Sequence, residues 1–393
     1  MITPDTKNRA CKRILFLTGT RADFGKLKPL IEQVEASPLF EASLFVTGMH
    51  MLSRYGYTLE EIQKAGFKKL FTYINQIESA SAQMDLVLAN TIQGLAYYVR
   101  ECPPDLIVIH GDRVEALAGA IVGSLNNILV AHVEGGELSG TIDELIRHSV
   151  SKLSHLHFVA NEEARTRLRQ MGEAPDSIFV VGSPDIDVML SQRLPSINEA
   201  QQRYGLPFPE YSIFLYHPVT TELPALRRNI GATVEALRAS GRKFLVIYPN
   251  NDSGSDVILE HILPLKEDPN FRVLPSLRFE YFLTLLKHAD AIVGNSSAGI
   301  REAPVYGVPT VNIGTRQLNR YRYPSIVNVP EGRESVQQAL RQLPSHSVPS
   351  LHFGDGRSAQ LFIERLLKES LWQVPRQKQF RDMQMTEIST AAL

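Results

Sequence analysis

A segment of small and polar residues in the last third of the chain has the composition of a phosphate-binding turn. Gly294, Asn295, Ser296 and Ser297 follow a short apolar run and precede a stretch with helical spacing. A turn between a strand and a helix points free backbone N–H groups and the positive end of the helix dipole at one place. Glu302 lies about 7–8 Å further along such a helix, at ~1.5 Å per residue, where its carboxylate could accept hydrogen bonds from a ribose. The segment therefore predicts a site for a nucleoside diphosphate.

Acidic residues follow two apolar runs in the first half of the chain. Asp112 and Arg113 follow the run 106–110 after a single glycine, while Glu134 and Glu137 flank a Gly-Gly pair after a second run. Glycine lets the backbone approach a ligand closely, and two acids in different environments can hold different protonation states. The pattern predicts a pair of carboxylates for acid/base chemistry beside a guanidinium that binds an anion.

Three further side chains fit the same chemistry. Arg21 lies in the polar loop after the first apolar run, where its guanidinium could face a phosphate or a sugar. His217 ends an apolar run just before a proline and could donate to a phosphate or a glycosidic oxygen. Arg147 follows the acidic loop on an expected helix, so we expect it to orient the carboxylates.

The sequence lacks the motifs of several other ligand classes. It contains neither the GxGxxG spacing that seats NAD nor the GxxxxGK[ST] of P-loop enzymes. Its two cysteines form no CxxC pair, and His155 and His157 have no carboxylate or thiol partner in a metal-binding pattern. We therefore predict no nicotinamide and no catalytic metal.

Short apolar runs alternate with amphipathic stretches along most of the chain, which predicts an α/β fold with doubly wound parallel sheets. The alternation lapses into a polar stretch near residue 190 and then resumes. We predict a first domain over 1–190 that carries the acids, a second over 191–365 that binds the nucleotide, and a helix end and tail over 366–393 that packs back on the first. In such sheets the ligand lies outside the carboxyl ends of the strands.

The composition of the chain indicates where the protein is located and which class of partner it binds. The 393 residues carry a net charge of −1 with basic residues scattered, so neither nucleic acid nor an anionic membrane is indicated as a partner. The start of the chain lacks a secretory signal pattern, and no apolar stretch reaches the roughly 18–20 residues of a membrane span. We expect a cytoplasmic protein whose partner is a small molecule.

The motifs, taken in order, resemble the UDP-N-acetylglucosamine 2-epimerase family. Those that carry the resemblance are 18–23 (TGTRAD), 46–50 (VTGMH), 110–113 (HGDR), 134–137 (EGGE), 139–141 (SGT), 217–218 (HP) and 294–297 (GNSS). The segments 135–137 and 218–220 are similar to the hydrolysing branch, which serves sialic acid and related nonulosonic acid synthesis.

The resemblance implies two facing Rossmann-like domains of the glycosyltransferase-B type, with UDP held mainly by the second domain. It implies no cofactor, and a homodimer or homotetramer. By motif match, the catalytic candidates are Asp112, Glu134 and His217, and the nucleotide or phosphate contacts are Arg21, Arg113, His217, Asn250, Ser296, Ser297 and Glu302. Substrate-contacting or supporting candidates are Asp23, His50, Glu137, Asp143, Arg147, Gly294, Asn295, Arg278 and Arg316.

The expected reaction converts UDP-N-acetylglucosamine and water to N-acetylmannosamine and UDP. Elimination of UDP gives a glycal, water adds at C1, and a proton returns to C2. One alternative is a hydrolysing 2-epimerase of a UDP- or GDP-linked 2,4-diacetamido-2,4,6-trideoxyhexose, as in legionaminic acid synthesis. Others are a nucleotide-sugar glycosyltransferase and a nucleotide-sugar sensor. The sequence leaves open the nucleotide, the substituents at C4 and C6, the division of roles between the acids, and regulation.

Overall fold

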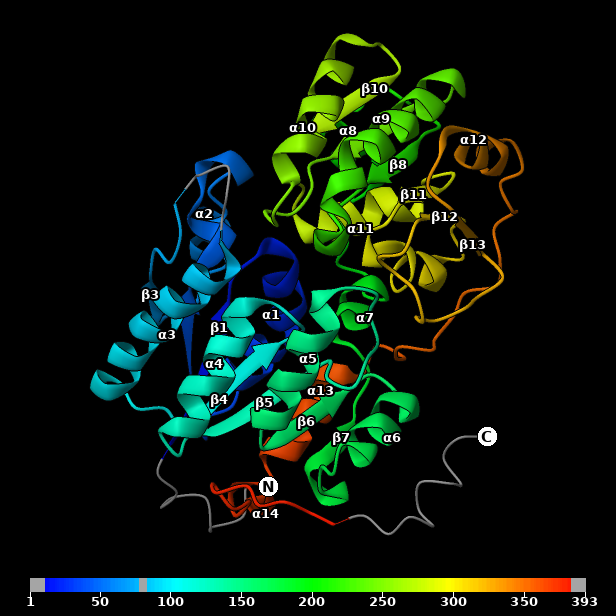
Figure 1. Ribbon diagram of the computed structural model, residues 1–393. Helices are drawn as coiled ribbons and strands as arrows, with labels where there is room; N and C mark the ends of the chain where they lie inside the picture. The colour runs from blue at the N-terminus through cyan, green and yellow to red at the C-terminus, as the bar shows by residue number, and fades with distance from the viewer. Residues whose placement is uncertain (1–10, 78–82, 383–393) are drawn as a thin grey trace.

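The computed structural model describes residues 11–77 and 83–382, and within them the chain forms two parallel sheets (Figure 1). In the described part, the first sheet has seven strands in the order β3-β2-β1-β4-β5-β6-β7. Its strands are β1 (Lys12–Thr18), β2 (Phe40–Val46), β3 (Leu70–Thr72), β4 (Leu106–His110), β5 (Leu129–Val133), β6 (Leu156–Val159) and β7 (Ile178–Val180). The order reverses between β1 and β4, which creates a crevice at the carboxyl ends of these two strands.

Helices connect the strands of this first sheet. They are α1 (Arg21–Glu35), α2 (Leu59–Lys64), α3 (Met84–Glu101), α4 (Val114–Leu125), α5 (Ile142–Leu153), α6 (Glu162–Gln170) and α7 (Pro184–Met189). A capping box starts α1, because the Thr20 hydroxyl accepts from the Asp23 amide while the Asp23 carboxylate accepts from the Thr20 amide. This cap fixes the loop that carries Arg21 at the crevice.

The second sheet has six described strands in the order β10-β9-β8-β11-β12-β13. These are β8 (Ser212–Leu215), β9 (Phe244–Ile247), β10 (Phe271–Leu274), β11 (Ile292–Gly294), β12 (Thr310–Ile313) and β13 (Ile326–Val329). The helices that follow α7 are α8 (Ile197–Tyr204), α9 (Leu223–Ala239), α10 (Ser255–Ile262), α11 (Phe279–Lys287), α12 (Arg333–Arg341), α13 (Ser358–Leu366) and α14 (Glu369–Trp372). The order reverses again, here between β8 and β11. The predicted fold of two doubly wound α/β domains is confirmed.

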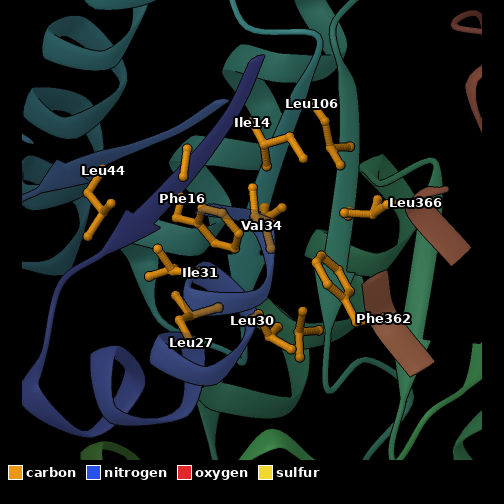
Figure 2. Packing of buried hydrophobic residues seen from close by; sticks show 14 of the residues in the cluster. Ile14, Phe16, Leu27, Leu30, Ile31, Val34, Leu44, Leu106, Phe362 and Leu366 are labelled. Carbon is orange, nitrogen blue, oxygen red and sulfur yellow. The ribbon is translucent and has the colours of Figure 1, made fainter. Parts of the chain in front are cut away.

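The last helices return to the first domain. Phe362 and Leu366 of α13 are fully buried in the same core as Ile14 and Phe16 of β1, and Figure 2 shows these side chains together. The Phe362 ring lies 4.7 Å from the Phe158 ring, centroid to centroid. The chain therefore leaves the second domain before α13, whereas the sequence analysis placed that boundary at residue 365.

One local prediction is wrong. The stretch that follows the Ser296 turn has helical spacing, but the structure has two short 3₁₀ turns there, at Ser297–Gly299 and Ala303–Tyr306. Pro304 has no N–H to donate to the carbonyl of Ile300, so the ladder of an α-helix cannot run through this segment. The dipole directed at Ser296 and Ser297 is therefore weaker than that of the expected α-helix.

Within the described ranges, no helix combines the length and the apolar character that a membrane crossing requires.

We expect Phe362→Ala to destabilise the first domain by about 3–5 kcal/mol, because it leaves a cavity in a closely packed core. Urea denaturation followed by a probe in that domain measures the loss. Phe380→Ala is the matched control, since the Phe380 side chain is 85% exposed and its removal should change the free energy of unfolding by less than ~0.5 kcal/mol. Equal, small effects of the two changes would contradict the role given to α13.

Candidate active site

A cavity of about 330 Å³ lies between the carboxyl ends of the two sheets, within the usual size range of small-molecule sites. Both domains line it, as the ligand rule for parallel sheets predicts. The predicted residues that line it are Arg21, Asp23, Asp112, Arg113, Glu134, Asp143, Arg147, His217, Asn250, Ser296, Ser297, Glu302 and Arg316. The predicted residues that are not part of its lining are His50, Glu137, Gly294, Asn295 and Arg278.

Asp112 is an ionised carboxylate held by guanidinium groups. Arg147 donates to its Oδ2, and a terminal nitrogen of Arg320 lies 3.9 Å from the same oxygen. Burial opposes ionisation, but the positive charges of Arg147, Arg320 and Arg316 outweigh it and lower the pKa of Asp112 to about 2. The Asp112 side chain is 23% exposed, so it can still reach a ligand in the cavity.

Glu134 is buried among positive and polar groups. Its Oε1 accepts from a terminal nitrogen of Arg301 at 2.7 Å, and its Oε2 lies 3.0 Å from Nε2 of His110 and 3.6 Å from Nζ of Lys26. Burial opposes ionisation, yet the field of Arg301 and Lys26 holds the pKa of Glu134 well below its usual value. Its backbone has φ 64°, a strained conformation for a residue other than glycine. This conformation is held because Glu134 donates its amide to the Phe158 carbonyl at 2.9 Å.

Arg301 joins the two domains. It follows β11 of the second domain and donates to Glu134, Glu137 and Ser183, all of them before the domain boundary in the sequence. A second ion pair across the cleft joins Arg316 to Asp143, with 3.0 Å between nitrogen and oxygen. Charges buried to this extent are stable only when they are paired, so these contacts fix how the domains face each other.

His217 is a neutral hydrogen-bond donor. The Asn250 amide donates to its Nδ1 at 3.0 Å, so the proton of the neutral ring is on Nε2. Burial, together with the positive charges of Arg316 and Arg113, holds the pKa of His217 well below the usual 6.5. Asn295 fixes its backbone, because the Asn295 side chain accepts from the His217 amide at 2.6 Å and donates to its carbonyl at 2.9 Å.

The turn after β11 needs glycine and serine for different reasons. Gly294 has φ 130°, and a side chain there would lie against the carbonyl oxygen of Leu215. The Ser296 hydroxyl accepts from the Ala298 amide at 3.3 Å, which closes the first 3₁₀ turn. Gly294 and Asn295 thus support the site from behind, whereas Ser296 and Ser297 line it.

Glu302 has one carboxylate oxygen free for a ligand. Its Oε1 lies 3.4 Å from Nζ of Lys26, while its buried Oε2 has no hydrogen-bond partner among the described residues. Burial, only partly offset by Lys26, raises the pKa of Glu302. A pair of hydroxyl groups could satisfy this oxygen, as the ribose hypothesis requires.

Two arginines of the first domain at the cleft contact the second domain. Arg21 donates to the Ser276 hydroxyl and to Glu61, each at 2.7 Å. Arg113 donates to Oδ1 of Asn251 at 2.9 Å. Both guanidinium groups line the cavity, and these hydrogen bonds position them before a diphosphate binds.

Four of the predicted supporting residues act at a distance from the cavity or on its rim. Asp23 accepts from the amides of Gly19 and Thr20, so it organises the loop after β1. His50 is buried behind this loop, where burial lowers its pKa to about 4. Glu137 pairs with Arg301, and Arg278 stacks over the Tyr281 ring, 5.7 Å from its centroid.

Sequence reasoning missed several residues of the site. Lys26, Arg301 and Arg320 line the cavity, and so does His110. For His110 the signal was present, because it ends β4 two residues before Asp112. For the other three, no local pattern distinguishes them from surface residues of a helix or loop. The cavity also has an apolar wall formed by Pro275, Leu277, Phe279, Phe282 and Tyr248.

The arrangement can bind a molecule with an anionic and a flat apolar part. Ser296, Arg316 and Arg113 surround space for a diphosphate, and the apolar wall offers contact for a nucleobase. Asp112 and Glu134 lie across the same cavity, so an atom next to the diphosphate could exchange a proton with a carboxylate.

Comparisons with known proteins agree with this geometry. A family model described as UDP-N-acetylglucosamine 2-epimerase matches residues 32–367. The chain is 48% identical over 379 residues to a UDP-N-acetylglucosamine 2-epimerase of Neisseria meningitidis serogroup B, which covers 95% of this chain and 100% of that protein. It is 33% identical over 357 residues to a UDP-N,N'-diacetylbacillosamine 2-epimerase (hydrolyzing) of Legionella pneumophila, covering 89% and 94% of the two chains.

Solved structures share the fold. A UDP-GlcNAc 2-epimerase from Methanocaldococcus jannaschii, crystallised with UDP-GlcNAc and UDP, matches with a TM-score of 0.76 at 21% identity. The match covers 90% of this chain and 99% of that one. At this identity the likeness establishes the two-domain fold alone.

We expect His217 to remain neutral, with its proton on Nε2, as the pH falls through the ordinary histidine value of 6.5, because protonation would place a third positive charge beside Arg316 and Arg113. Long-range ¹H–¹⁵N NMR spectra of the imidazole measure both the tautomer and the titration. The His217→Asn variant identifies the signal. A ring that titrates near 6.5, or that carries its proton on Nδ1, would contradict the assignment.

Proposed function

The chain belongs to the UDP-N-acetylglucosamine 2-epimerase family, and on this premise we propose that it is a hydrolysing 2-epimerase that converts UDP-N-acetylglucosamine and water to N-acetylmannosamine and UDP. The observation that supports it is the juxtaposition of Asp112 and Glu134 with the Ser296 turn across one interdomain cavity. A product of this kind would supply sialic or related nonulosonic acid synthesis.

The proposed reaction begins with an elimination. The C2 hydrogen of a 2-acetamido sugar has no neighbouring carbonyl to stabilise a carbanion, so its loss must accompany loss of the anomeric substituent. A carboxylate takes the C2 proton, the C–H electron pair forms the C1–C2 double bond, and the C1–O bond breaks to release UDP. Water then adds its oxygen to C1, and a proton returns to C2 from the opposite face, which gives the free epimer.

Asp112 is the carboxylate that we propose to contact the sugar directly. Its side chain is 23% exposed, whereas that of Glu134 is 4% exposed and has both oxygens occupied by neighbours. A diphosphate bound near Arg316 would offset part of the positive field on Asp112 and raise its pKa toward a range useful for a base. Glu134 would then exchange protons through His110, which lies 3.0 Å away and lines the same cavity.

The departing diphosphate would be stabilised by fixed donors. We propose that His217 donates from Nε2, that Ser296 and Ser297 donate hydroxyl hydrogen bonds, and that Arg113 and Arg316 supply charge. These groups are positioned before the substrate binds, because Asn250 and Asn295 hold His217 and ion pairs or hydrogen bonds hold the arginines.

Further properties remain proposals from the resemblance. The reaction as proposed requires no nicotinamide and no metal, because the side chains of the cavity supply each proton transfer. We also propose that the protein acts in the cytoplasm and as a homo-oligomer.

The nearest alternative is the same chemistry on a diacetamido-trideoxy sugar. Two relatives carry such names, one at 33% identity from Legionella pneumophila and one at 30% from Campylobacter jejuni. The two substrates differ at C4 and C6, where a site that reads hydroxyl groups rejects a deoxy analogue strongly. A glycosyltransferase on the same fold is the second alternative and would need an acceptor.

The proposed function is tested by proton NMR of the protein with UDP-N-acetylglucosamine in D₂O. We expect free N-acetylmannosamine with deuterium at C2, together with UDP. Asp112→Asn should lower turnover by about 10²–10⁴-fold, since it removes a proton-transfer group, and should leave UDP binding in place. A nucleotide-linked epimer would contradict hydrolysis, and turnover only of the diacetamido substrate would favour the alternative.

We expect Glu302→Gln to weaken UDP binding by about tenfold or more, because hydrogen bonds to a charged group contribute ~1.5–3 kcal/mol. Isothermal titration calorimetry measures the affinity, and kcat should change less. Glu260→Gln is a suitable control, since the Glu260 side chain lies on the surface of the same domain and is 56% exposed. An unchanged UDP affinity in Glu302→Gln would exclude the ribose contact.

A further inference from the structure

A second cavity of about 350 Å³ lies between the domains, on the other side of the Arg301 contact. Its walls come from the loop after β5, the start of α6, the loop between β12 and β13, and the segment before α13. Arg301 and Arg320 line both this second cavity and the catalytic cavity. The two cavities are therefore separated by a layer of charged side chains.

The lining of the second cavity is positively charged. Four guanidinium groups and two carboxylates face it, and both carboxylates already have a partner. Glu137 pairs with Arg301, and Oε2 of Glu163 lies 3.1 Å from a terminal nitrogen of Arg167. Among the described residues, the one ion-pair partner of Arg320 is Asp112, at 3.9 Å, and Arg322 has no ion-pair partner. The positive charge of Arg322 thus has no ion-pair partner, and that of Arg320 has one at a distance of 3.9 Å.

Buried donors in this wall lack acceptors. The Nε groups of Arg320 and Arg301 are buried and have no hydrogen-bond partner among the residues described. The Arg320 side chain is only 7% exposed, and burial together with Arg147 lowers its pKa to about 10. A buried donor without an acceptor is unfavourable. An oxyanion in this cavity would supply hydrogen-bond acceptors that the described residues do not supply.

Aromatic side chains in the lining of the second cavity can contact the body of a polar molecule. The His352 ring stacks on the Tyr321 ring with 4.1 Å between centroids and 9° between planes. The Asn161 amide lies 2.9 Å from Nε2 of His352, so the proton of the neutral ring is on Nδ1. The cavity has the volume for a sugar-sized ligand beside these aromatic faces.

We propose that the second cavity binds a small oxyanion, a carboxylate or phosphate on a sugar-sized body, and that its occupant competes with Asp112 for Arg320. The anion would pair with Arg322 and with the unpartnered edge of Arg320. Drawing Arg320 from Asp112 removes one of the two guanidinium groups that hold this carboxylate in position, so binding in the second cavity lowers turnover in the first.

Calorimetry with UDP present at saturation tests the binding, because UDP occupies the anion site of the catalytic cavity. The probes are sodium glucuronate for a carboxylate, glucose 1-phosphate for a phosphate, and neutral glucose. We expect saturable binding of at least one anionic probe and none of glucose, and the probe that binds identifies the anion. Arg322→Gln should weaken it about tenfold or more, as loss of a charge-assisted hydrogen bond does.

Arg333→Gln is the matched control, because Arg333 is an exposed arginine paired with Glu235 and lies outside the second cavity. Three results would overturn the site: no saturable binding of either anionic probe, equal binding of glucose, or equal weakening by the two arginine changes. Binding that is lost when UDP is added would place the probe in the catalytic cavity and would also overturn it.

The coupling is tested by turnover of the nucleotide sugar, and this part rests on the proposed function. The bound probe should lower kcat with little change in KM, and Arg322→Gln should remove the inhibition without changing kcat in the absence of probe. A rise in KM alone, or binding without any change in kcat, would overturn the coupling. If the protein does not turn over the nucleotide sugar, the binding experiment still decides the second cavity.

Discussion

The ion pairs of Arg301 with Glu134 and Glu137 are the contact on which the geometry of the catalytic cavity depends. Arg301 enters from the second domain and meets carboxylates of the first, and none of the three side chains is open to solvent. Buried charges of this kind are stable only with their partners in place. In this arrangement of the domains these charges are satisfied, and the two domains together line the cavity for the ligand.

The arginines around Asp112 and Glu134 also determine the protonation states of these two acids. Asp112 and Glu134 are both ionised, because guanidinium groups outweigh the cost of burying them. An anionic substrate competes for that positive charge, so its arrival strengthens the carboxylates as bases. Substrate binding and the activation of the acids are in this way one electrostatic event, since both draw on the same arginines.

Backbone geometry supports this arrangement from behind. The left-handed conformation of Glu134 and the turn at Gly294 each place a strand end where an ordinary extended chain would not. Helix α13 closes the first core with Phe362, so the chain crosses between the domains a second time. Two chain connections between the domains restrict their relative movement more than one connection does. The two halves of the site are therefore kept aligned.

The sequence by itself determined the two parallel sheets and the loops that carry Asp112, Glu134, His217 and Ser296. These follow from local rules, because apolar alternation marks strands and the carboxyl ends of parallel strands gather at one edge. Only the tertiary structure decided the roles of Lys26, Arg301 and Arg320 and the 3₁₀ turns at 297–306. Arg301 and Glu134 are 167 residues apart, and nothing in their local spacing encodes the closure that pairs them. Long-range charge pairing depends on how whole domains pack, which a local pattern does not contain.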